Sequence, residues 1–247
     1  MAKTSGLGDN FYLAGYDLSG DTNSLGNIGG GPALLDVTAI NKSAFERIGG
    51  LRDGRMEFVA YFNTTAGQAH PRLSTLPTTD VIATYARGTT LGDPAASIVA
   101  KQINYDGTRA ADGDFKFAVN AQANAYGLEW GVQGTAGIRT DTTATNGTSI
   151  DNGASSAFGL QAYLHVFAFT GTSLTVTIQE SSDNAVGDPF ANVVGGSFTA
   201  ATGITSERIA TASGLTVERY LRVVTTGTFT NAQFAVNIVR NDTAVTF

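Results

Sequence analysis

The sequence predicts an all-β protein of two sandwich-like domains with one short helix, and three observations support this. Charged residues make up only 15% of the 247 residues, whereas 30 residues are glycine. Threonine, valine and phenylalanine are frequent, and such β-branched and aromatic side chains favour strands joined by glycine-containing turns. Apolar and polar side chains also alternate along several segments, which is the period of a strand and not of a helix.

The longest alternation runs from residue 114 to residue 139. Its apolar side carries Phe115, Phe117, Val119, Ala121, Ala123 and Ala125. Its polar side carries Asp114, Lys116, Asn120, Gln122 and Asn124. After Tyr126-Gly127 the alternation resumes, and it predicts Trp130 on the apolar side and Glu129 on the polar side. The pattern therefore predicts a sheet with one face in a core and the other face on a polar surface.

Residues 1–36 are expected to form an N-terminal arm or long loop. Glycine, asparagine, aspartate and serine dominate this segment, so it lacks the side chains for a core of its own. A disordered tail is the alternative. The aromatic side chains of Phe11, Tyr12 and Tyr16 favour an arm that docks on another surface, because disordered segments are poor in aromatic residues.

Residues 37–140 are expected to form the first β-domain. Its short helix is predicted at residues 41–48, since Ser43 and Glu46 have the spacing of a capping box and Gly49-Gly50 would end the helix. The strands of this domain, besides the long alternation, are predicted at residues 55–62, 81–86 and 96–103.

The remainder of the chain is expected to form a linker and a second β-domain. Residues 141–156 contain almost nothing apolar, which is typical of a linker. Residues 157–247 are expected to form a jelly-roll-like β-sandwich. Its first hairpin is predicted at Gly171-Thr172-Ser173. Its later strands are predicted at residues 190–194, 197–200, 208–210, 217–224 and 233–240.

Composition excludes several classes of function. The net charge is −6, which argues against a site that grips nucleic-acid phosphates. The chain has no cysteine, so it has neither disulfides nor thiolate metal sites. No apolar run approaches the roughly 20 residues that span a bilayer, and the first residues lack the apolar core of a signal peptide. We therefore expect a protein that is made in the cytoplasm and has no membrane partner.

The sequence offers no pattern of catalytic residues. His70 and His165 are the only histidines, and they fall in different predicted domains. A nucleophile elbow, a His-Glu-x-x-His pair and a phosphate-binding loop are all missing from the sequence. We expect no enzyme activity, no catalytic residue, no metal and no cofactor, and we expect His165 to be a structural histidine in the core or on the surface.

Several segments of the first 140 residues resemble the major tail tube proteins of long-tailed phages of actinobacteria. The matching segments are Glu46-Arg47-Ile48-Gly49-Gly50-Leu51-Arg52-Asp53-Gly54, Leu76-Pro77-Thr78-Thr79-Asp80, Gly92-Asp93-Pro94-Ala95-Ala96, Asn104-Tyr105-Asp106, and Gly113-Asp114-Phe115 running to Gly127-Leu128-Glu129-Trp130-Gly131. The resemblance implies a β-sandwich whose subunits form rings, usually hexameric, with inner strands joined in a β-barrel around a lumen. Residues 157–247 are similar to β-sandwich modules appended to phage structural proteins.

The resemblance implies a structural virion protein of the phage tail, assembled in the host cytoplasm, whose stacked rings conduct DNA. Its partners would be further copies of itself, the tape-measure protein, other tail proteins, and double-stranded DNA that passes without specific binding. The acidic, lysine-poor composition agrees, because such a lining does not hold phosphates. The residues expected to face the lumen are Asp114, Lys116, Asn120, Gln122, Asn124 and Glu129.

Two other interpretations remain open. A capsid decoration protein or a minor tail protein would suit the same composition and the same appended sandwich. A carbohydrate-binding receptor module would use Trp130, Tyr163 or Tyr220 to stack on sugars. The predicted position of Trp130 on the apolar side of its strand counts against this second alternative.

Overall fold

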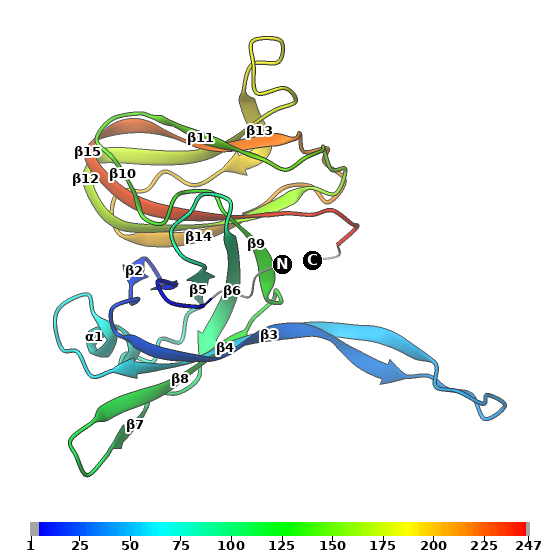
Figure 1. The fold of residues 1–247 in the computed structure, drawn as a ribbon, viewed down its shortest axis with the longest axis vertical. Helices are drawn as coiled ribbons and strands as arrows, with labels where there is room; N and C mark the ends of the chain where they lie inside the picture. The colour runs from blue at the N-terminus through cyan, green and yellow to red at the C-terminus, as the bar shows by residue number, and fades with distance from the viewer. Residues whose placement is uncertain (1–4, 246–247) are drawn as a thin grey trace.

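The computed structural model describes residues 5–245, which form antiparallel β-structure with one short helix, as the sequence predicts. The strands make two bodies, and a long hairpin projects from one of them (Figure 1). The N-terminal body contains β1 (Asn10–Leu13), β2 (Tyr16–Asp17), β3 (Thr22–Asp36), β4 (Arg47–Tyr61), α1 (Ala69–Leu73), β5 (Val81–Ala86), β6 (Pro94–Gln102), β7 (Asp106–Arg109), β8 (Phe115–Ala123) and β9 (Glu129–Gln133). The C-terminal body contains β10 (Arg139–Asp141), β11 (Asn146–Asp151), β12 (Leu160–Ser181), β13 (Ala191–Ser197), β14 (Thr205–Ala210) and β15 (Tyr220–Arg240).

The core of the N-terminal body is filled by alternate residues of β1, β4, β5, β6 and β8. Met56 and Phe58 from β4 meet Ile98 from β6 and Val119 from β8, and all four are buried. The helix α1 closes one side of this core with the buried side chain of Leu73. Two-residue alternation therefore identified the strands, because each strand has one face in this core.

The short helix lies at Ala69–Leu73, so its prediction at residues 41–48 was wrong. Residues 37–46 instead make the turn between β3 and β4. The backbone N–H of Glu46 donates to the Thr38 hydroxyl at 2.8 Å, and that of Val37 donates to the Glu46 carbonyl at 3.0 Å. The spacing of Ser43 and Glu46 mimics a capping box, but the chain must reverse here because β3 and β4 pair with each other.

The C-terminal body is organised by two strands of unusual length, β12 and β15, which pair with each other from end to end. The predicted hairpin at residues 171–173 is wrong, because β12 continues through it. The register shifts on both sides of Gly171, which marks a β-bulge where a turn was expected. A Cβ on Gly171 would lie 2.5 Å from the Cα of Phe229, so only glycine permits this approach. The segments predicted at 217–224 and 233–240 likewise belong to one strand, β15.

Residues 141–156, whose composition predicted a linker, are part of the C-terminal body. β10 and β11 both pair with β15. Polar side chains suit β11 because its residues are exposed or only half-buried. The division into an N-terminal segment (residues 1–36), two β-domains and a linker, with the bounds predicted from the sequence, remains a prediction.

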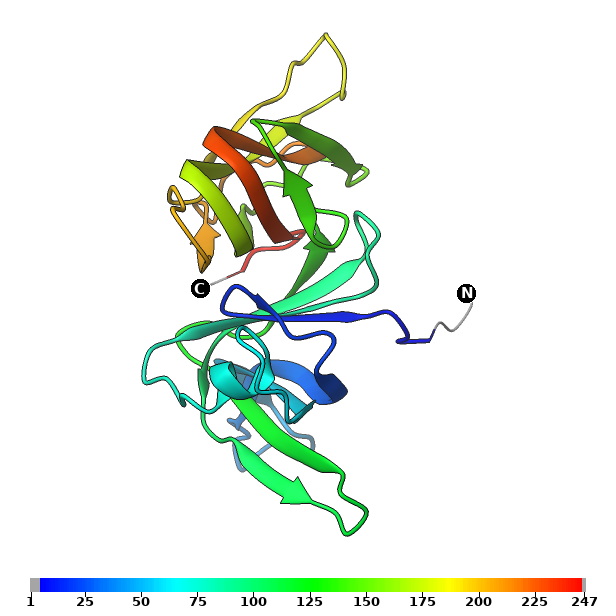
Figure 2. The same ribbon diagram turned by 90° about the vertical axis from the view of Figure 1, so that its left-hand side faces the viewer.

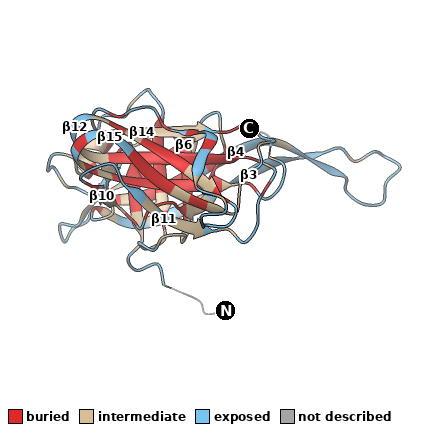
Figure 3. Cartoon of the chain, turned by 90° about the horizontal axis from the view of Figure 1, so that it is seen from above, coloured by how far each residue is buried: buried red, intermediate tan, exposed pale blue. Residues whose placement is uncertain are grey.

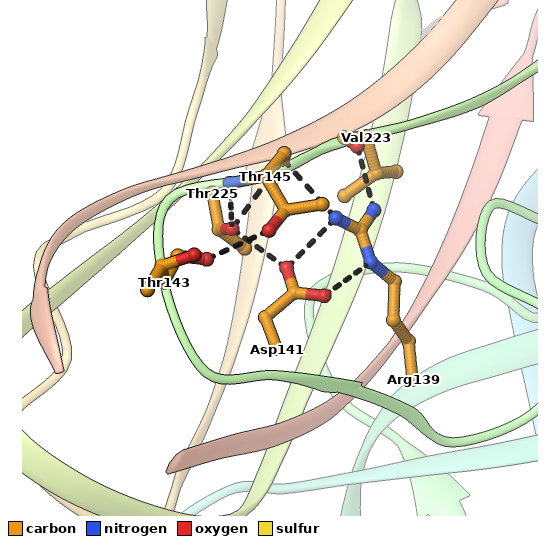
Figure 4. Close-up of polar contacts among 6 residues, drawn as sticks. All are labelled: Arg139, Asp141, Thr143, Thr145, Val223 and Thr225. Atoms are coloured by element: carbon orange, nitrogen blue, oxygen red, sulfur yellow. Dashed lines mark hydrogen bonds and ion pairs between the residues drawn. The ribbon is translucent and has the colours of Figure 1, made fainter. Parts of the chain in front are cut away.

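The turn between β10 and β11 is held by partly buried polar contacts (Figure 4). Arg139 binds both carboxylate oxygens of Asp141, at 2.8 and 2.7 Å, and donates to the Val223 carbonyl at 2.8 Å. Thr225 donates its hydroxyl to Asp141 at 2.6 Å and accepts the backbone N–H of Thr145 at 3.1 Å. These contacts fasten the turn to β15.

The two bodies share a buried layer of side chains. Figure 3, which looks along the long axis, shows buried segments of both bodies overlapping in the middle of the view. The strands on either side of this layer are buried on both faces, so alternate residues serve a core and the layer. The N-terminal body contributes Tyr12, Ile82, Thr84, Ala86, Ala95, Ser97 and Val99. The C-terminal body contributes Gln161, Tyr163, His165, Ala235, Asn237 and Val239. Strand β9 joins the bodies because it pairs with both β6 and β15; Figure 2 shows them stacked along the long axis.

The contacts of Asp141 give a first prediction. The variant Asp141→Asn should lower the free energy of unfolding by about 2–4 kcal/mol, because it removes the buried anion that pairs with the half-buried guanidinium of Arg139. Urea unfolding followed by circular dichroism measures this change. The matched control is Asp242→Asn, since Asp242 also binds an arginine but its side chain is 76% exposed; its change should stay below about 1 kcal/mol. Equal effects of the two variants would contradict the assignment.

Candidate functional site: the hairpin arm and the polar face of β8

The outer part of the β3–β4 hairpin, residues 31–53, is called the arm here because it extends into solvent away from both bodies (Figure 1). Closer to the body, Gly54, Met56 and Phe58 of β4 are buried. The hairpin leaves the body where Gly30 pairs with Gly54. A Cβ on Gly30 would lie 2.4 Å from the Asp53 carbonyl oxygen, and one on Gly54 would lie 2.5 Å from the Leu128 nitrogen. Both glycines therefore let backbones touch at the base of the arm.

The arm carries large apolar side chains that face water. They are Leu34, Leu35, Val37, Ile40, Phe45, Ile48 and Leu51. Their exposed fractions run from 47% for Leu35 and Val37 to 108% for Ile40. Seven large apolar side chains exposed on one projecting hairpin are typical of an interaction site on a folded protein. The sequence did not reveal a projecting hairpin, since residues 41–48 were expected to be a short helix.

The polar face of β8 lies on the same sheet as the base of the arm. β4 and β8 pair from Arg55 opposite Gln122 to Tyr61 opposite Lys116. The side chains that point away from the core are Arg55, Glu57, Val59, Tyr61, Lys116, Ala118, Asn120 and Gln122. This set is mostly polar and contains cations and an anion.

Charges on this face are neutralised locally. The Lys116 ammonium lies 2.7 Å from a carboxylate oxygen of Asp114, and this hydrogen bond raises the pKa of Lys116 above its usual value. Arg55 lies 3.5 Å from Glu57. The side-chain amide of Gln122 donates to Asp53 at 2.7 Å. The face is thus polar without an unpaired cation among these residues.

Four of the six residues predicted to face a lumen are brought together here. Lys116, Asn120 and Gln122 lie on the face itself, and Asp114 adjoins it just before β8 begins. Asn124 follows the end of β8 and donates its side-chain amide to Asp80 at 2.9 Å, next to β6 rather than on the face. That these side chains line a channel remains a prediction.

Glu129 does not share this surface, because it is buried between the two bodies. Arg208 on β14 binds its two carboxylate oxygens at 3.0 and 3.1 Å, and the Tyr163 hydroxyl also donates to it. Glu129 thus lies on the face opposite Leu128, as predicted, but the C-terminal body covers that face. Trp130, predicted on the apolar side, lies opposite Ala96 of the N-terminal core and is nevertheless 52% exposed.

His165 lies at the centre of the layer between the bodies. Its Nδ1 accepts the backbone N–H of Gly15 at 3.2 Å, and its Nε2 lies 2.9 Å from the Thr84 hydroxyl. Thr84 contacts the Ser97 hydroxyl at 2.8 Å, and Ser97 accepts from the Asn237 amide at 2.8 Å. Burial lowers the pKa of His165 to about 3, so the imidazole is neutral. His165 is thus a structural core histidine.

The two histidines have no carboxylate partner in these contacts. His70 Nδ1 lies 3.0 Å from the Tyr105 hydroxyl, and His165 contacts Thr84 and Gly15. Within residues 5–245, no group of three or more histidine, aspartate or glutamate side chains is placed to hold a metal ion. No helix in that range is long and apolar enough to cross a membrane.

Comparisons with known proteins give only distant likenesses. No family model matches the sequence, and no curated protein matches it. Among solved structures, the Dit protein of phage SPP1, described as a paradigm of the hub adsorption apparatus in phages that infect Gram-positive bacteria, is 12% identical with a TM-score of 0.34, over 93% of this chain and 98% of that chain. A chain of the phage p2 baseplate, in its activated conformation with Sr, is 8% identical with a TM-score of 0.33, over 95% and 99% of the two chains. TM-scores this low do not establish a common fold.

The burial of His165 gives a second prediction. Unfolded histidine has a pKa near 6.5, so between about pH 6.5 and 3 the unfolded chain binds a proton that the folded chain does not. The free energy of unfolding should therefore fall by about 1 kcal/mol per pH unit as the pH drops from 6.5 to 5. The variant His165→Gln should lose this slope, whereas His70→Gln should keep it. Urea titrations at several pH values measure the slope, and an unchanged slope in His165→Gln would refute the assignment.

Proposed function

We propose that this chain is a structural subunit that assembles with copies of itself through the arm, and that its assembly is the tail tube of a phage. The exposed apolar arm carries the proposal. The sequence resemblance of residues 1–140 to tail tube proteins supplies the biological setting. In that setting the subunits form rings, usually of six, which stack to conduct DNA and meet the tape-measure and other tail proteins.

The arm favours self-assembly for an energetic reason. Burying one leucine, isoleucine or phenylalanine side chain is worth about 1.5–3 kcal/mol. Ile40, Phe45 and Leu51 gain little of this stabilisation within the chain because they are largely exposed. A second copy that covers these side chains would provide the missing stabilisation. An arm that reaches an unlike surface on the next copy makes a contact that repeats, which yields rings or filaments rather than closed dimers.

Two unpaired strand edges favour ring closure. Among the strands of residues 5–245, β3 pairs only with β4 and β7 only with β8, so the run β3–β4–β8–β7 has an unpaired edge on each side. Unpaired edges promote pairing with another chain, and a closed barrel removes them. A ring of subunits joined edge to edge would place the polar face of β8 on one wall of that barrel. We propose that this wall lines the lumen.

The polar face suits DNA that passes without binding. Its cations, Lys116 and Arg55, are each paired with a carboxylate. Phosphate affinity arises when unpaired lysine and arginine side chains displace counterions from the DNA. A wall with paired charges and amides offers little of that affinity, which permits transit.

The arm can be tested directly. The triple variant Leu34→Ser, Ile40→Ser, Phe45→Ser should remain folded but lose assembly, at a cost of tenfold or more in the association constant per substitution. Light scattering after size-exclusion chromatography and negative-stain microscopy report the assembly state. The control is Val186→Ser with Val194→Ser, since these valines are 93% and 73% exposed on the C-terminal body. Rings or tubes of normal size from the triple variant would overturn the proposal, as would a wild-type chain that stays monomeric at every concentration.

The lumen wall can be tested by adding charge. Phage that carry Asn120→Lys with Gln122→Lys should build intact tails but eject DNA more slowly, and raised salt should relieve the defect. Thr228→Lys with Thr230→Lys adds the same charge to exposed positions of the C-terminal body and should leave ejection unchanged. Ejection rates that match wild type in the first variant would show that the face of β8 is not the channel wall.

A further inference from the structure

A groove lies at the base of the arm, between the arm and segments of both bodies. Its volume is about 540 Å³. One wall is the arm itself, a second wall is the segment between β8 and β9, and a third wall is the segment that follows β15. The apolar residues that line it are Pro32, Leu51, Ala125, Tyr126, Ala244 and Val245. We call this hollow the base groove.

The base groove can receive apolar side chains without leaving a buried charge unpaired. The carboxylate in its lining, Glu129, already accepts two hydrogen bonds from Arg208. The Arg208 guanidinium also lies 3.8 Å from the ring centroid of Tyr126, which holds that wall in place. Arg52, which also lines the groove, is exposed, so its charge can stay in water. An apolar guest therefore does not strip water from an unpaired charge.

The arm does not fill its own groove. β3 and β4 stay paired as far as Asp36 opposite Arg47, which holds the arm as an extended two-stranded ribbon. The tip of the arm, residues 37–46, points away from both bodies (Figure 1). Phe45 in the tip precedes Leu51 in the groove by six residues, which is roughly 20 Å of extended chain. An arm tip that enters a base groove must therefore belong to another molecule.

The tip has the apolar side chains that such a groove receives. Val37, Ile40 and Phe45 are 47%, 108% and 70% exposed. The arm is a ribbon of two strands, and such ribbons are marginally stable until they pack on another surface. Its seven exposed apolar side chains present on the order of 600 Å² of apolar surface, comparable with the roughly 800 Å² that each partner of a stable protein complex buries. A surface of this size needs a protein partner, because a small ligand cannot cover it.

We propose that the base groove receives the arm tip of a second copy of this chain. The inference rests on the proposed self-assembly and specifies the surface that receives the arm. Ile40 and Phe45 of one copy lie against Leu51 and Tyr126 of the other, so one contact covers exposed apolar side chains on both partners. A second copy fits because each chain carries one tip and one groove. Tip and groove are unlike surfaces, so the contact repeats from copy to copy around a ring.

The chain has no cysteine, so introduced cysteines report their own contacts alone. One full-length protein carries Ala44→Cys in the tip, and a second carries Ala125→Cys in the groove; both positions are exposed. The two proteins are mixed and treated with a short bis-maleimide, which joins thiols that lie close together. The matched control pairs Ala44→Cys with Val186→Cys, a position that is 93% exposed on the C-terminal body. The groove pair should give about tenfold or more linked product than the control pair, because docking raises the effective concentration of the two thiols.

Light scattering on the same mixtures separates this inference from the proposed self-assembly. Assemblies in which the tip links no better to the groove than to the control position would overturn the inference and leave self-assembly in place. Ala44→Cys that links mainly to itself would show that tips meet tips, and this too would overturn it. A closed dimer linked at the groove pair would support the inference and contradict the ring. Chains that stay monomeric would contradict both. Ala244→Cys, on another wall of the groove, repeats the test if Ala125→Cys does not fold.

Discussion

The packing of the two bodies against each other is the constraint on which the rest of the structure depends. β5, β6, β12 and β15 each place one set of alternate residues in a core and the other set in the shared layer. Two polar clusters in that layer are paired: His165 with Thr84, and Glu129 with Arg208 and Tyr163. Buried polar groups are costly when unpaired, so these contacts favour one relative position of the bodies. The arm and the polar face of β8 therefore belong to one packed unit.

Much of the fold could be predicted from the sequence wherever a strand has a core of its own. β5 lies at the predicted residues 81–86, and the alternation of β8 correctly placed Val119 and Ala121 inside. Prediction failed where the local structure is decided by a contact with a segment far away in the sequence. The residues around Gly171 have the composition of a turn, yet pairing with β15 makes Gly171 part of a β-bulge. The polar composition of residues 141–156 did not indicate the strand β11, for which β15 supplies the partner.

The candidate sites were predictable to a smaller extent, for the same reason. Alternation correctly grouped Lys116, Asn120 and Gln122, because they share one uninterrupted strand. Glu129 was misplaced because its face of β9 is covered by the C-terminal body, whose Arg208 is 79 residues away in the sequence. The arm was missed because the spacing of Ser43 and Glu46 imitates a helix start, and because the sequence does not show that its apolar side chains stay uncovered. Local pattern reports which residues share a face; it does not report what lies against that face.

The order of the strands has a consequence for synthesis on the ribosome. β9 pairs with residues 237–238 of β15, more than a hundred residues later, and Thr84 meets His165 only once β12 exists. The N-terminal body therefore emerges with the apolar side chains of Tyr12, Ile82 and Val99 uncovered until nearly the whole chain has been translated. Contacts of such long sequence separation slow folding and leave nascent chains open to aggregation. Nascent subunits on one mRNA therefore expose two apolar surfaces at once, the uncovered layer and the arm. Only the arm stays exposed after the complete chain has folded.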